Sequence, residues 1–310
     1  MLTVRIGAVV ANWNGGEENL RCLESILAQG IPGRDVYFVD NGSEDGSVEL
    51  VRERLPEVQV LRNPENLGYA AASNRGSKAA LDSGADGVLL VNNDAVLPGG
   101  VVDALVAALE AEPELGIVGP RIVYLSDPAR LWSAGGVLTW RQNLSTLLGH
   151  GQPDEPHWSR TRPVDYIPGC VMLVRRKVFE RVGFMDAEFF AYMEDIDYCL
   201  RARNAGFLVE VVGSACALHD ASHTTGGGYN PRRKYMMGVN SVWFLRRHAR
   251  LHQWIRFFVY DVATLPFLWL FALFQGTSRS VLGKALGIFD GLRGKRVTGS
   301  AIQPGASWLW

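Results

Sequence analysis

Short apolar runs alternate with amphipathic segments over the first 120 residues of the chain. Near-continuous apolar runs of this kind are typical of strands that a sheet buries on both faces; they occupy residues 6–11, 36–39, 58–61 and 87–92. In the intervening segments apolar residues recur three or four positions apart, as on the buried side of a helix; these segments are 20–27, 48–55, 70–83 and 98–112. The alternation predicts a parallel α/β sheet with right-handed crossovers.

Polar residues follow three of these four apolar runs, at 12–14, 40–43 and 92–94. In an open sheet of this class, ligands bind beyond the carboxyl ends of the strands. We therefore expect a binding site at the edge of the sheet where the three polar stretches meet.

The pattern becomes less regular between residues 120 and 220. A polar stretch at 149–163 contains prolines and histidines, and we expect it to form a loop over the site. The acidic segment that begins at Glu194 is followed by Cys199 and Leu200, which predicts a helix that enters the core.

The last part of the chain is predicted to be helical and to contact a membrane. Residues 235–256 have the pattern of a basic helix, and residues 257–274 are strongly apolar. Eighteen residues is a marginal length for a membrane span, and Asp261 and Pro266 interrupt it. We therefore expect an interfacial or re-entrant helix.

Composition is that of an ordinary globular protein, with 47% hydrophobic and 20% charged residues among 310. The four cysteines lack CxxC spacing, so the sequence indicates neither a zinc site nor a disulfide framework. The chain enters a strand pattern at once, without the layout of a signal peptide. These features predict a reducing, cytoplasmic setting.

The net charge of −1 conceals an asymmetry. Residues 1–220 carry 19 Lys and Arg against 30 Asp and Glu, whereas residues 221–310 carry 12 against 2. Five of the nine tryptophans follow residue 240. A basic, Trp-containing segment beside an apolar run predicts contact with a membrane surface. It carries no known nucleic-acid reader motif, so we expect no nucleic-acid partner; a solvated helix face is the plainer alternative.

Residues with side chains suited to catalysis or metal binding lie in three short stretches. Asp94 ends the fourth strand, Glu194 and Asp195 lie in an aromatic setting, and His219 stands alone. A carboxylate and an imidazole can hold a divalent metal, while a second carboxylate can accept a proton. Beside a nucleotide-binding sheet, this set would suit group transfer from an activated nucleotide.

A longer series of motifs resembles the family 2 glycosyltransferases, and in particular the rhamnosyltransferase-like branch that extends cell-surface polysaccharides. The motifs are Val-Ala-Asn-Trp-Asn-Gly at 10–15, Val-Asp-Asn-Gly-Ser at 39–43, Asn-Pro-Glu-Asn-Leu-Gly-Tyr at 63–69, Asn-Asn-Asp at 92–94, Pro-Gly-Cys at 168–170, Phe-Ala-Tyr-Met-Glu-Asp-Ile-Asp-Tyr-Cys-Leu-Arg at 190–201, and His219. The likeness covers residues 4–250. It implies the GT-A fold, inversion at the anomeric carbon, a nucleotide-sugar donor (dTDP or UDP) and Mn²⁺ or Mg²⁺.

The resemblance also assigns roles at the reacting centre. Asp94 matches the last residue of the DxD-type motif, and with His219 it is expected to hold the metal. Asp195 is expected to be the catalytic base. Glu194 is expected to share the contact with the acceptor or to raise the proton affinity of Asp195.

Further residues are assigned to the donor. Asp40 matches the position that binds the pyrimidine edge, although an Asx-turn is the plainer alternative. The remaining donor-binding candidates are Asn12, Asn14, Asn66, Gly68, Asn74, Asn92 and Asn93. The last two replace the other positions of the DxD-type motif and are candidates for binding ribose or sugar hydroxyls. The candidates for sugar platforms, for which core packing is an equal alternative, are Trp132, Trp140 and Trp158.

Two further pairs of residues are not assigned to the substrates. Asp197 and Arg201 are four residues apart and are predicted to form a helical ion pair. Val239 and Asn240 stand where relatives often carry an Arg-Asn pair, so the usual basic contact is missing there.

Two alternatives remain beside glycosyl transfer. A GT-A-like sugar nucleotidyltransferase would carry a Gly-rich, basic signature after the first strand, but residues 12–18 are acidic and contain no lysine. A non-catalytic membrane-bound scaffold would not need Asp94, Asp195 and His219 together. A dinucleotide oxidoreductase is excluded because GxGxxG is missing after the first strand.

We therefore expect a metal-dependent inverting glycosyltransferase, peripheral at the inner face of the cell membrane. Its expected partners are a nucleoside-diphosphate sugar and a glycan or lipid-linked acceptor, and a homo-oligomer is left open. The expected organisation is a GT-A domain over 1–230, with a donor half at 1–120 and an acceptor half at 121–230. A membrane-associating helical extension follows at 231–310.

Overall fold

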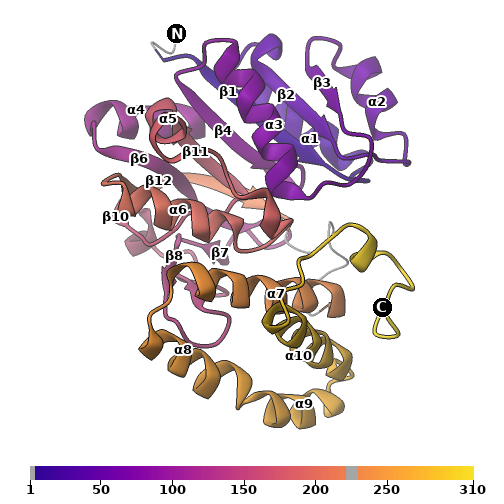
Figure 1. Ribbon diagram of the computed structural model, residues 1–310. Helices are drawn as coiled ribbons and strands as arrows, with labels where there is room; N and C mark the ends of the chain where they lie inside the picture. Colours follow the sequence, from indigo (N-terminus) through magenta and orange to yellow (C-terminus); the bar gives the residue numbers. More distant parts are fainter. Residues whose placement is uncertain (1–3, 221–229) are drawn as a thin grey trace.

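The four predicted strands are present in the computed structural model, which describes residues 4–220 and 230–310. They are parallel, in the spatial order β3-β2-β1-β4, with bounds β1 (Ile6–Asn12), β2 (Val36–Asp40), β3 (Gln59–Arg62) and β4 (Gly87–Asn92). The four predicted helices connect and follow them, as α1 (Glu18–Leu27), α2 (Ser47–Arg54), α3 (Tyr69–Asp82) and α4 (Val101–Ala111). Figure 1 shows this half of the molecule in indigo and purple.

The alternating directions of the apolar side chains along β1 explain why the sheet carries helices on both faces. Val9 packs into one core with residues of α3, whereas Ala8 and Val10 pack into the other with residues of α1, α2 and α4. Side chains of a strand point alternately to opposite faces, so a run without polar residues requires cover on both.

The sheet continues past β4 as a mixed sheet. Its further strands include β6 (Leu115–Tyr124), β11 (Val171–Arg175) and β12 (Leu208–His219), and the full order is β10-β12-β6-β11-β4-β1-β2-β3. β11 begins at Val171 opposite Val91, at the carboxyl end of β4, and therefore runs antiparallel to β4. The predicted parallel arrangement holds for β1 to β4, and the inserted β11 is the difference.

Short elements complete this part of the chain. The strands are β5 (Ala95–Val96), β7 (Leu131–Ser133), β8 (Gly136–Leu138), β9 (Ser145–Leu147) and β10 (Arg162–Pro163). The helices are α5 (Arg176–Val182) and α6 (Glu194–Asn204), with 3₁₀ turns at Gly33–Asp35, Pro156–Ser159 and Ala187–Phe189. α6 is the predicted helix, and Cys199 on it is buried in the core.

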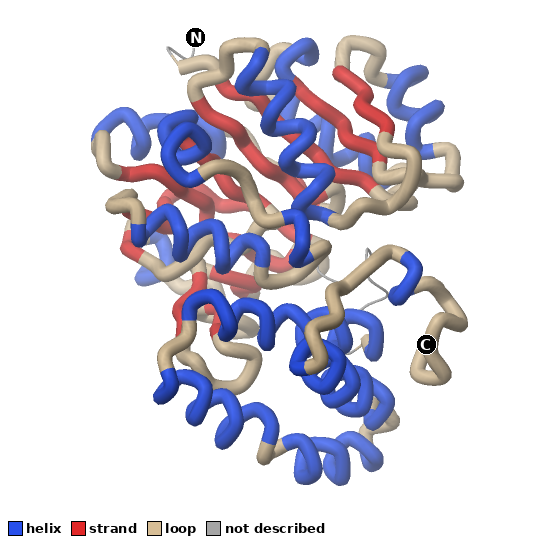
Figure 2. Tube along the Cα trace, viewed as in Figure 1, coloured by secondary structure: helices blue, strands red, loops and turns tan. Residues whose placement is uncertain are grey.

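The C-terminal part is a layer of helices beside the sheet domain (Figures 1 and 2). Its elements are α7 (Pro231–His248), α8 (Leu251–Phe257), a π-helical turn (Phe258–Val262), α9 (Leu265–Phe274), α10 (Ser278–Leu292) and a 3₁₀ turn (Ser300–Ile302). The single basic helix predicted over 235–256 is instead two helices, because Ala249 and Arg250 have extended backbones.

Glycines allow α7 and α10 to approach closely. A Cβ on Gly287 would lie 2.1 Å from the carbonyl oxygen of Tyr235, and one on Gly238 would lie 2.5 Å from that of Lys284. α10 therefore packs directly against α7, and it leaves α8 and α9 on the outside of the layer (Figure 1).

The helical stretch Leu251–Phe274 is long and apolar enough to cross a membrane by length and composition alone, and 17% of its most apolar window is buried. Its Asp261 nevertheless faces the protein and is fully buried. Asp261 pairs with the ammonium group of Lys284 and accepts from the backbone N–H of Asn143 at 3.0 Å. This buried ion pair fixes the middle of the stretch to α10 and to the β8–β9 hairpin.

Candidate active site at the carboxyl edge of the sheet

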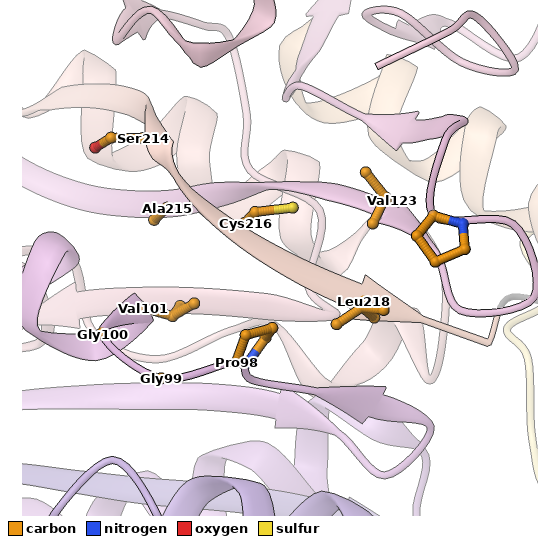
Figure 3. A pocket seen from close by; sticks show the side chains of 10 residues that line it. Pro98, Gly99, Gly100, Val101, Val123, Ser214, Ala215, Cys216 and Leu218 are labelled. Carbon is orange, nitrogen blue, oxygen red and sulfur yellow. The ribbon is translucent and has the colours of Figure 1, made fainter. Parts of the chain in front are cut away.

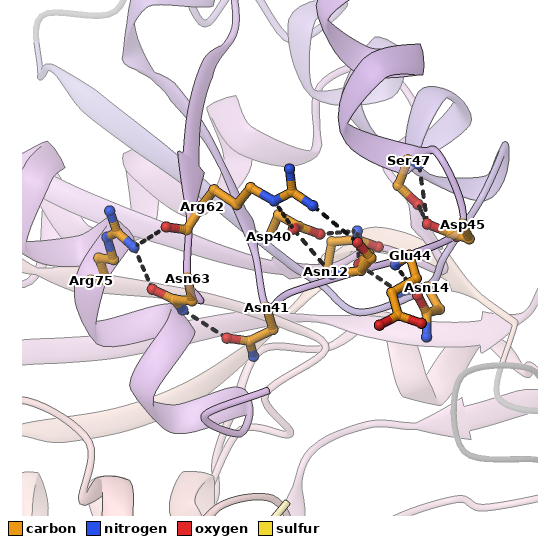
Figure 4. A network of polar contacts seen from close by, with 11 residues as sticks. Asn12, Asn14, Asp40, Asn41, Glu44, Asp45, Ser47, Arg62, Asn63 and Arg75 are labelled. Atoms are coloured by element: carbon orange, nitrogen blue, oxygen red, sulfur yellow. Dashed lines mark hydrogen bonds and ion pairs between the residues drawn. The ribbon is translucent and has the colours of Figure 1, made fainter. Parts of the chain in front are cut away.

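Asp40 organises the ends of β1, β2 and β3 (Figure 4). Its Oδ1 accepts from Asn12 Nδ2 at 3.0 Å, and its Oδ2 accepts from the Ser43 backbone N–H at 3.2 Å and lies 3.5 Å from Arg62 Nε. The side chain is fully buried, so its charge is balanced within the protein. The Asx-turn alternative fits these bonds, and the expected contact with a base edge stays a prediction.

Asn12 and Asn93 join the ends of β1 and β4. Asn93 Nδ2 donates to Asn12 Oδ1 and to Asn19 Oδ1, both at 3.2 Å. Asn14 has a positive φ of 53°, and its side chain accepts from the Glu44 backbone N–H at 3.0 Å. These predicted donor-binding residues therefore lie together at one edge of the sheet. Asn19 was not singled out from the sequence, since only the fold brings it beside Asn93.

The segment before α3 lies against the segment before α6. Asn66 Oδ1 accepts from the Gly68 backbone N–H at 2.9 Å. Gly68 has a φ of 88°, and a Cβ there would lie 2.4 Å from the carbonyl oxygen of Phe190. Asn74 bonds the backbone of Met185 through both amide atoms, at 2.7 and 3.1 Å. Asn74 thus ties α3 to the segment between α5 and α6, and its donor contact stays a prediction.

Asp94 and His219 are neighbours. β5 pairs with β12 so that Ala95 stands opposite His219, and the Asp220 backbone N–H donates to the Asp94 carbonyl at 2.9 Å. His219 Nε2 lies 3.1 Å from Asp94 Oδ1, and both side chains are buried. Within residues 4–220 and 230–310, His219 Nδ1 has no hydrogen-bond partner.

This pair fits a divalent metal. A carboxylate and an imidazole are ligand types that bind divalent metals, and their ligand atoms lie 3.1 Å apart here. The part of the chain that the structure describes holds no group of three or more His, Cys, Asp or Glu side chains suited to a metal. Asp94 and His219 would supply two of the ligands of such a metal.

Asp195 stands at the start of α6, where helix N-terminal N–H groups favour anions. Its Oδ2 accepts from the Gly169 backbone N–H at 3.0 Å, and its Oδ1 accepts from the Ile196 N–H at 2.8 Å. Burial raises the pKa of Asp195, and these two bonds oppose the rise. Asp195 is partly exposed.

Glu194 has different surroundings. It is buried, and its Oε2 has no hydrogen-bond partner among the described residues. Burial raises the pKa of Glu194 well above its usual range, and the nearby charge of Asp195 raises it further. Glu194 therefore holds its proton to higher pH than an ordinary glutamate does.

Gly169 and Cys170 connect the end of β4 to the acidic pair. The Asn92 backbone N–H donates to the Cys170 carbonyl at 2.9 Å, and Gly169 donates to Asp195 as described above. Burial raises the pKa of the Cys170 thiol, and the charges of Asp94 and Asp195 raise it further. The residues predicted from separate stretches thus meet at one edge of the sheet.

The three tryptophan candidates have different surroundings. The Trp132 ring centroid lies 4.6 Å from that of His219, so Trp132 borders the Asp94–His219 pair. Trp140 packs 5.6 Å from Phe244, and Trp158 is buried.

The predicted ion pair between Asp197 and Arg201 is confirmed, with Nε of Arg201 and Oδ2 of Asp197 2.7 Å apart.

A cavity of about 340 Å³ lies elsewhere, between the N-terminus of α4 and β12 (Figure 3). Its lining includes Pro98, Val101, Val123, Cys216 and Leu218, and the described residues that line it include no acidic residue or histidine. It therefore lacks the groups that the predicted chemistry needs.

Comparisons with known proteins agree with the geometry. The model of the glycosyltransferase-like family 2 matches residues 4–229. The chain is 32% identical over 250 residues to the N-acetylglucosaminyl-diphospho-decaprenol L-rhamnosyltransferase of Mycobacterium tuberculosis strain H37Rv, covering 73% of this chain and 79% of that protein.

Two solved structures share the fold. The mannosyltransferase PcManGT from Pyrobaculum calidifontis, in complex with GDP-Man and Mn²⁺, matches with a TM-score of 0.59 at 16% identity, over 95% of this chain and 89% of that one. GalNAc-T7 with UDP, GalNAc and Mn²⁺ matches with a TM-score of 0.58 at 14% identity, over 77% of this chain and 51% of that one. This chain therefore spans about half the length of the GalNAc-T7 chain.

The expected fold and family are thus confirmed. The protein is a glycosyltransferase of the GT-A fold and belongs to the glycosyltransferase-like family 2.

Proposed function

We propose that this protein transfers a sugar, rhamnose or one similar, from a dTDP- or UDP-sugar to a lipid-linked saccharide, with inversion at the anomeric carbon and with Mn²⁺ or Mg²⁺. The observation that carries the proposal is that Asp94 and His219 lie 3.1 Å apart, while Asp195 bonds Gly169, next to Cys170, whose carbonyl pairs with Asn92 at the end of β4. The acceptor class is taken from the name of the rhamnosyltransferase relative.

The donor is assigned to the edge formed by β1, β2 and β4. Its diphosphate would complete the coordination of a metal held by Asp94 and His219, whose atoms are 3.1 Å apart. The bound metal would offset the negative charge that develops on the leaving diphosphate. Asn92 and Asn93, which replace acidic residues of the DxD-type motif, bring amide groups for ribose or sugar hydroxyls to this edge.

Asp195 is assigned as the base. The acceptor hydroxyl attacks the anomeric carbon, Asp195 takes the hydroxyl proton, and the bond between that carbon and the phosphate oxygen breaks. A single displacement of this kind inverts the anomeric centre. The Gly169 and Ile196 N–H groups hold the Asp195 carboxylate in place. Glu194, with the more strongly raised pKa, is assigned to the acceptor contact as the protonated member of the pair.

The extension is assigned to a membrane surface, at the inner face of the cell membrane. The outer side of α9 exposes Phe267, Phe271 and Phe274 by 74%, 63% and 91%. Burying a large apolar side chain contributes about 1.5–3 kcal/mol. Asp261 is fixed inside the protein by Lys284, which favours a helix that lies on the membrane over one that crosses it.

A panel of donors tests the proposal. The protein is incubated with Mn²⁺, with N-acetylglucosaminyl-diphospho-decaprenol in liposomes, and with dTDP-rhamnose, UDP-glucose, UDP-N-acetylglucosamine or GDP-mannose. Mass spectrometry should detect transfer from a dTDP- or UDP-sugar that EDTA abolishes, and NMR should show the inverted anomer. Pyrophosphate release from a nucleoside triphosphate and a sugar 1-phosphate, without transfer, would instead support the nucleotidyltransferase alternative.

A further inference from the structure

The backbone immediately before the acidic pair has an unusual conformation. Phe190, Tyr192 and Met193 have φ angles of 61°, 70° and 77°. Side chains with a Cβ seldom adopt this region, so such a run persists only where the surroundings enforce it. Met193 is the N-cap of α6, and Asp195 is the second residue of that helix. The conformation of residues 189–193 therefore sets where the Asp195 carboxylate points.

One buried side chain on α7 holds this segment. Asn240 Nδ2 donates to the carbonyl oxygens of Phe189, Ala191 and Tyr192, at 2.7, 2.8 and 2.9 Å. Asn240 is 1% exposed, so these bonds form without competition from water. An amide nitrogen carries two hydrogens, so three acceptors share them. Three carbonyl groups that would otherwise repel one another are thus held around a single donor.

The opposite side of the segment rests on α3. The Ala70 backbone N–H donates to the Phe190 carbonyl at 3.3 Å, and Gly68 permits this close approach. The first turn of α6 is tied separately to α7, because Asp197 Oδ1 lies 2.8 Å from His248 Nε2. Residues 189–193 therefore have their own attachment, distinct from that of the helix they precede.

We propose that Asn240 is a positioning residue for the catalytic base. It acts through the Phe189, Ala191 and Tyr192 carbonyls, which fix the turn that presents Asp195. It touches neither the donor-binding asparagines nor the metal pair in the hydrogen bonds of the described residues. The inference rests on the proposed role of Asp195, and it gives α7 a part in catalysis besides support of the membrane-facing helices.

The test compares Asn240→Ala with a neighbouring control. Ser241→Ala changes an equally buried residue of α7 that has no hydrogen bond to residues 189–193. We expect Asn240→Ala to lower kcat per folded molecule by about 10²-fold, the usual effect of misplacing a catalytic group by about 1 Å. Its Kd for dTDP with Mn²⁺ should stay within about twofold of wild type, because a misplaced Asp195 would weaken an interaction that is made only in the transition state. Ser241→Ala should match the wild type in both.

The isosteric change Asn240→Asp supplies a second readout and covers the case in which the alanine variant does not fold. A protonated carboxyl can donate to one carbonyl, whereas an ionised one would face three carbonyl oxygens. Its kcat should therefore fall as pH rises, over a range where the wild type gains activity by ionising Asp195. A role in folding alone would scale kcat with the folded fraction and leave the shape of the pH profile unchanged.

Asp195→Asn is measured in parallel to separate the two proposals. If Asp195→Asn is inactive while the folded Asn240 variants keep kcat within twofold of wild type, the positioning inference is wrong and the proposed function stands. If the Asn240 variants lose dTDP binding and kcat equally, or if Asn240→Asp keeps the wild-type pH profile, the inference is also overturned. Turnover near wild type in Asp195→Asn would contradict the proposed base itself.

Discussion

Two adjacent carboxyl groups at the start of α6 have different surroundings, and the roles proposed for them rest on this difference. Glu194 is buried with an unpaired oxygen atom, whereas Asp195 is partly exposed and accepts two backbone hydrogen bonds. The sequence predicted that the pair would matter, but it could not rank the two pKa values, because burial and the Gly169 contact depend on the fold. Asn240 was noted only as part of an altered motif, since its three partners lie about 50 positions earlier in the chain.

The pKa of Glu194 predicts a pH effect on stability. The folded protein keeps this proton above the ordinary Glu pKa of about 4.3, at which the unfolded chain releases it. The folded state therefore binds more protons in this range, and the free energy of unfolding falls as pH rises toward the raised pKa of Glu194. Glu194→Gln, which cannot ionise, should lose less stability over the same range. Thermal unfolding of both proteins between pH 4.5 and 9 checks this, and parallel curves would contradict it.

The Asp94–His219 pair predicts a metal effect. Changing either residue to Ala should weaken Mn²⁺-dependent binding of dTDP by about tenfold or more, because each would remove one of two protein ligands. Calorimetry with and without EDTA measures this, and circular dichroism checks the fold. If neither EDTA nor either substitution changes the affinity for dTDP, these residues do not hold a metal.

Elements with a local pattern were predicted well, and those set by tertiary contacts were not. β1 to β4 and α1 to α4 follow from hydrophobic periodicity within each segment. The antiparallel course of β11 depends on where the chain returns to the sheet, which periodicity does not report. The break at Ala249 and Arg250 contains no proline or glycine, so the basic pattern was extended across it.

The exposed side of α9 predicts a salt-resistant contact with membranes. Changing Phe267, Phe271 and Phe274 together to Ser should reduce binding to anionic liposomes at least tenfold at high salt, where the attraction of basic residues is screened. Leu208→Ser, at an exposed position on β12, is the matched control and should bind as wild type does. Co-sedimentation at 0.05 and 0.5 M NaCl measures the difference. Equal binding of the triple variant and the wild type would rule out this surface.

The molecule as a whole joins the sheet, to which we assign the donor, to a helical layer through α7. Residues of α7 contact the segment before Asp195, and α10 and the β8–β9 hairpin hold Asp261 in the middle of the outer helices. An acceptor embedded in a membrane would be presented on the side of α8 and α9. The fold class followed from the order of strands and helices in the sequence. The close packing of α7 on α10 did not, because it depends on glycines that meet only in the folded chain.

The most direct test of the account measures the transfer rate of Asp195→Asn. With the donor selected by the panel, with Mn²⁺ and with a lipid-linked acceptor, kcat should fall by about 10²–10⁴, the usual contribution of a general base. The Kd for the nucleotide with Mn²⁺ should stay within about twofold of wild type, because Asp195 is assigned to the acceptor and not to the donor. Turnover near wild type in a folded, nucleotide-binding Asp195→Asn protein would contradict the account.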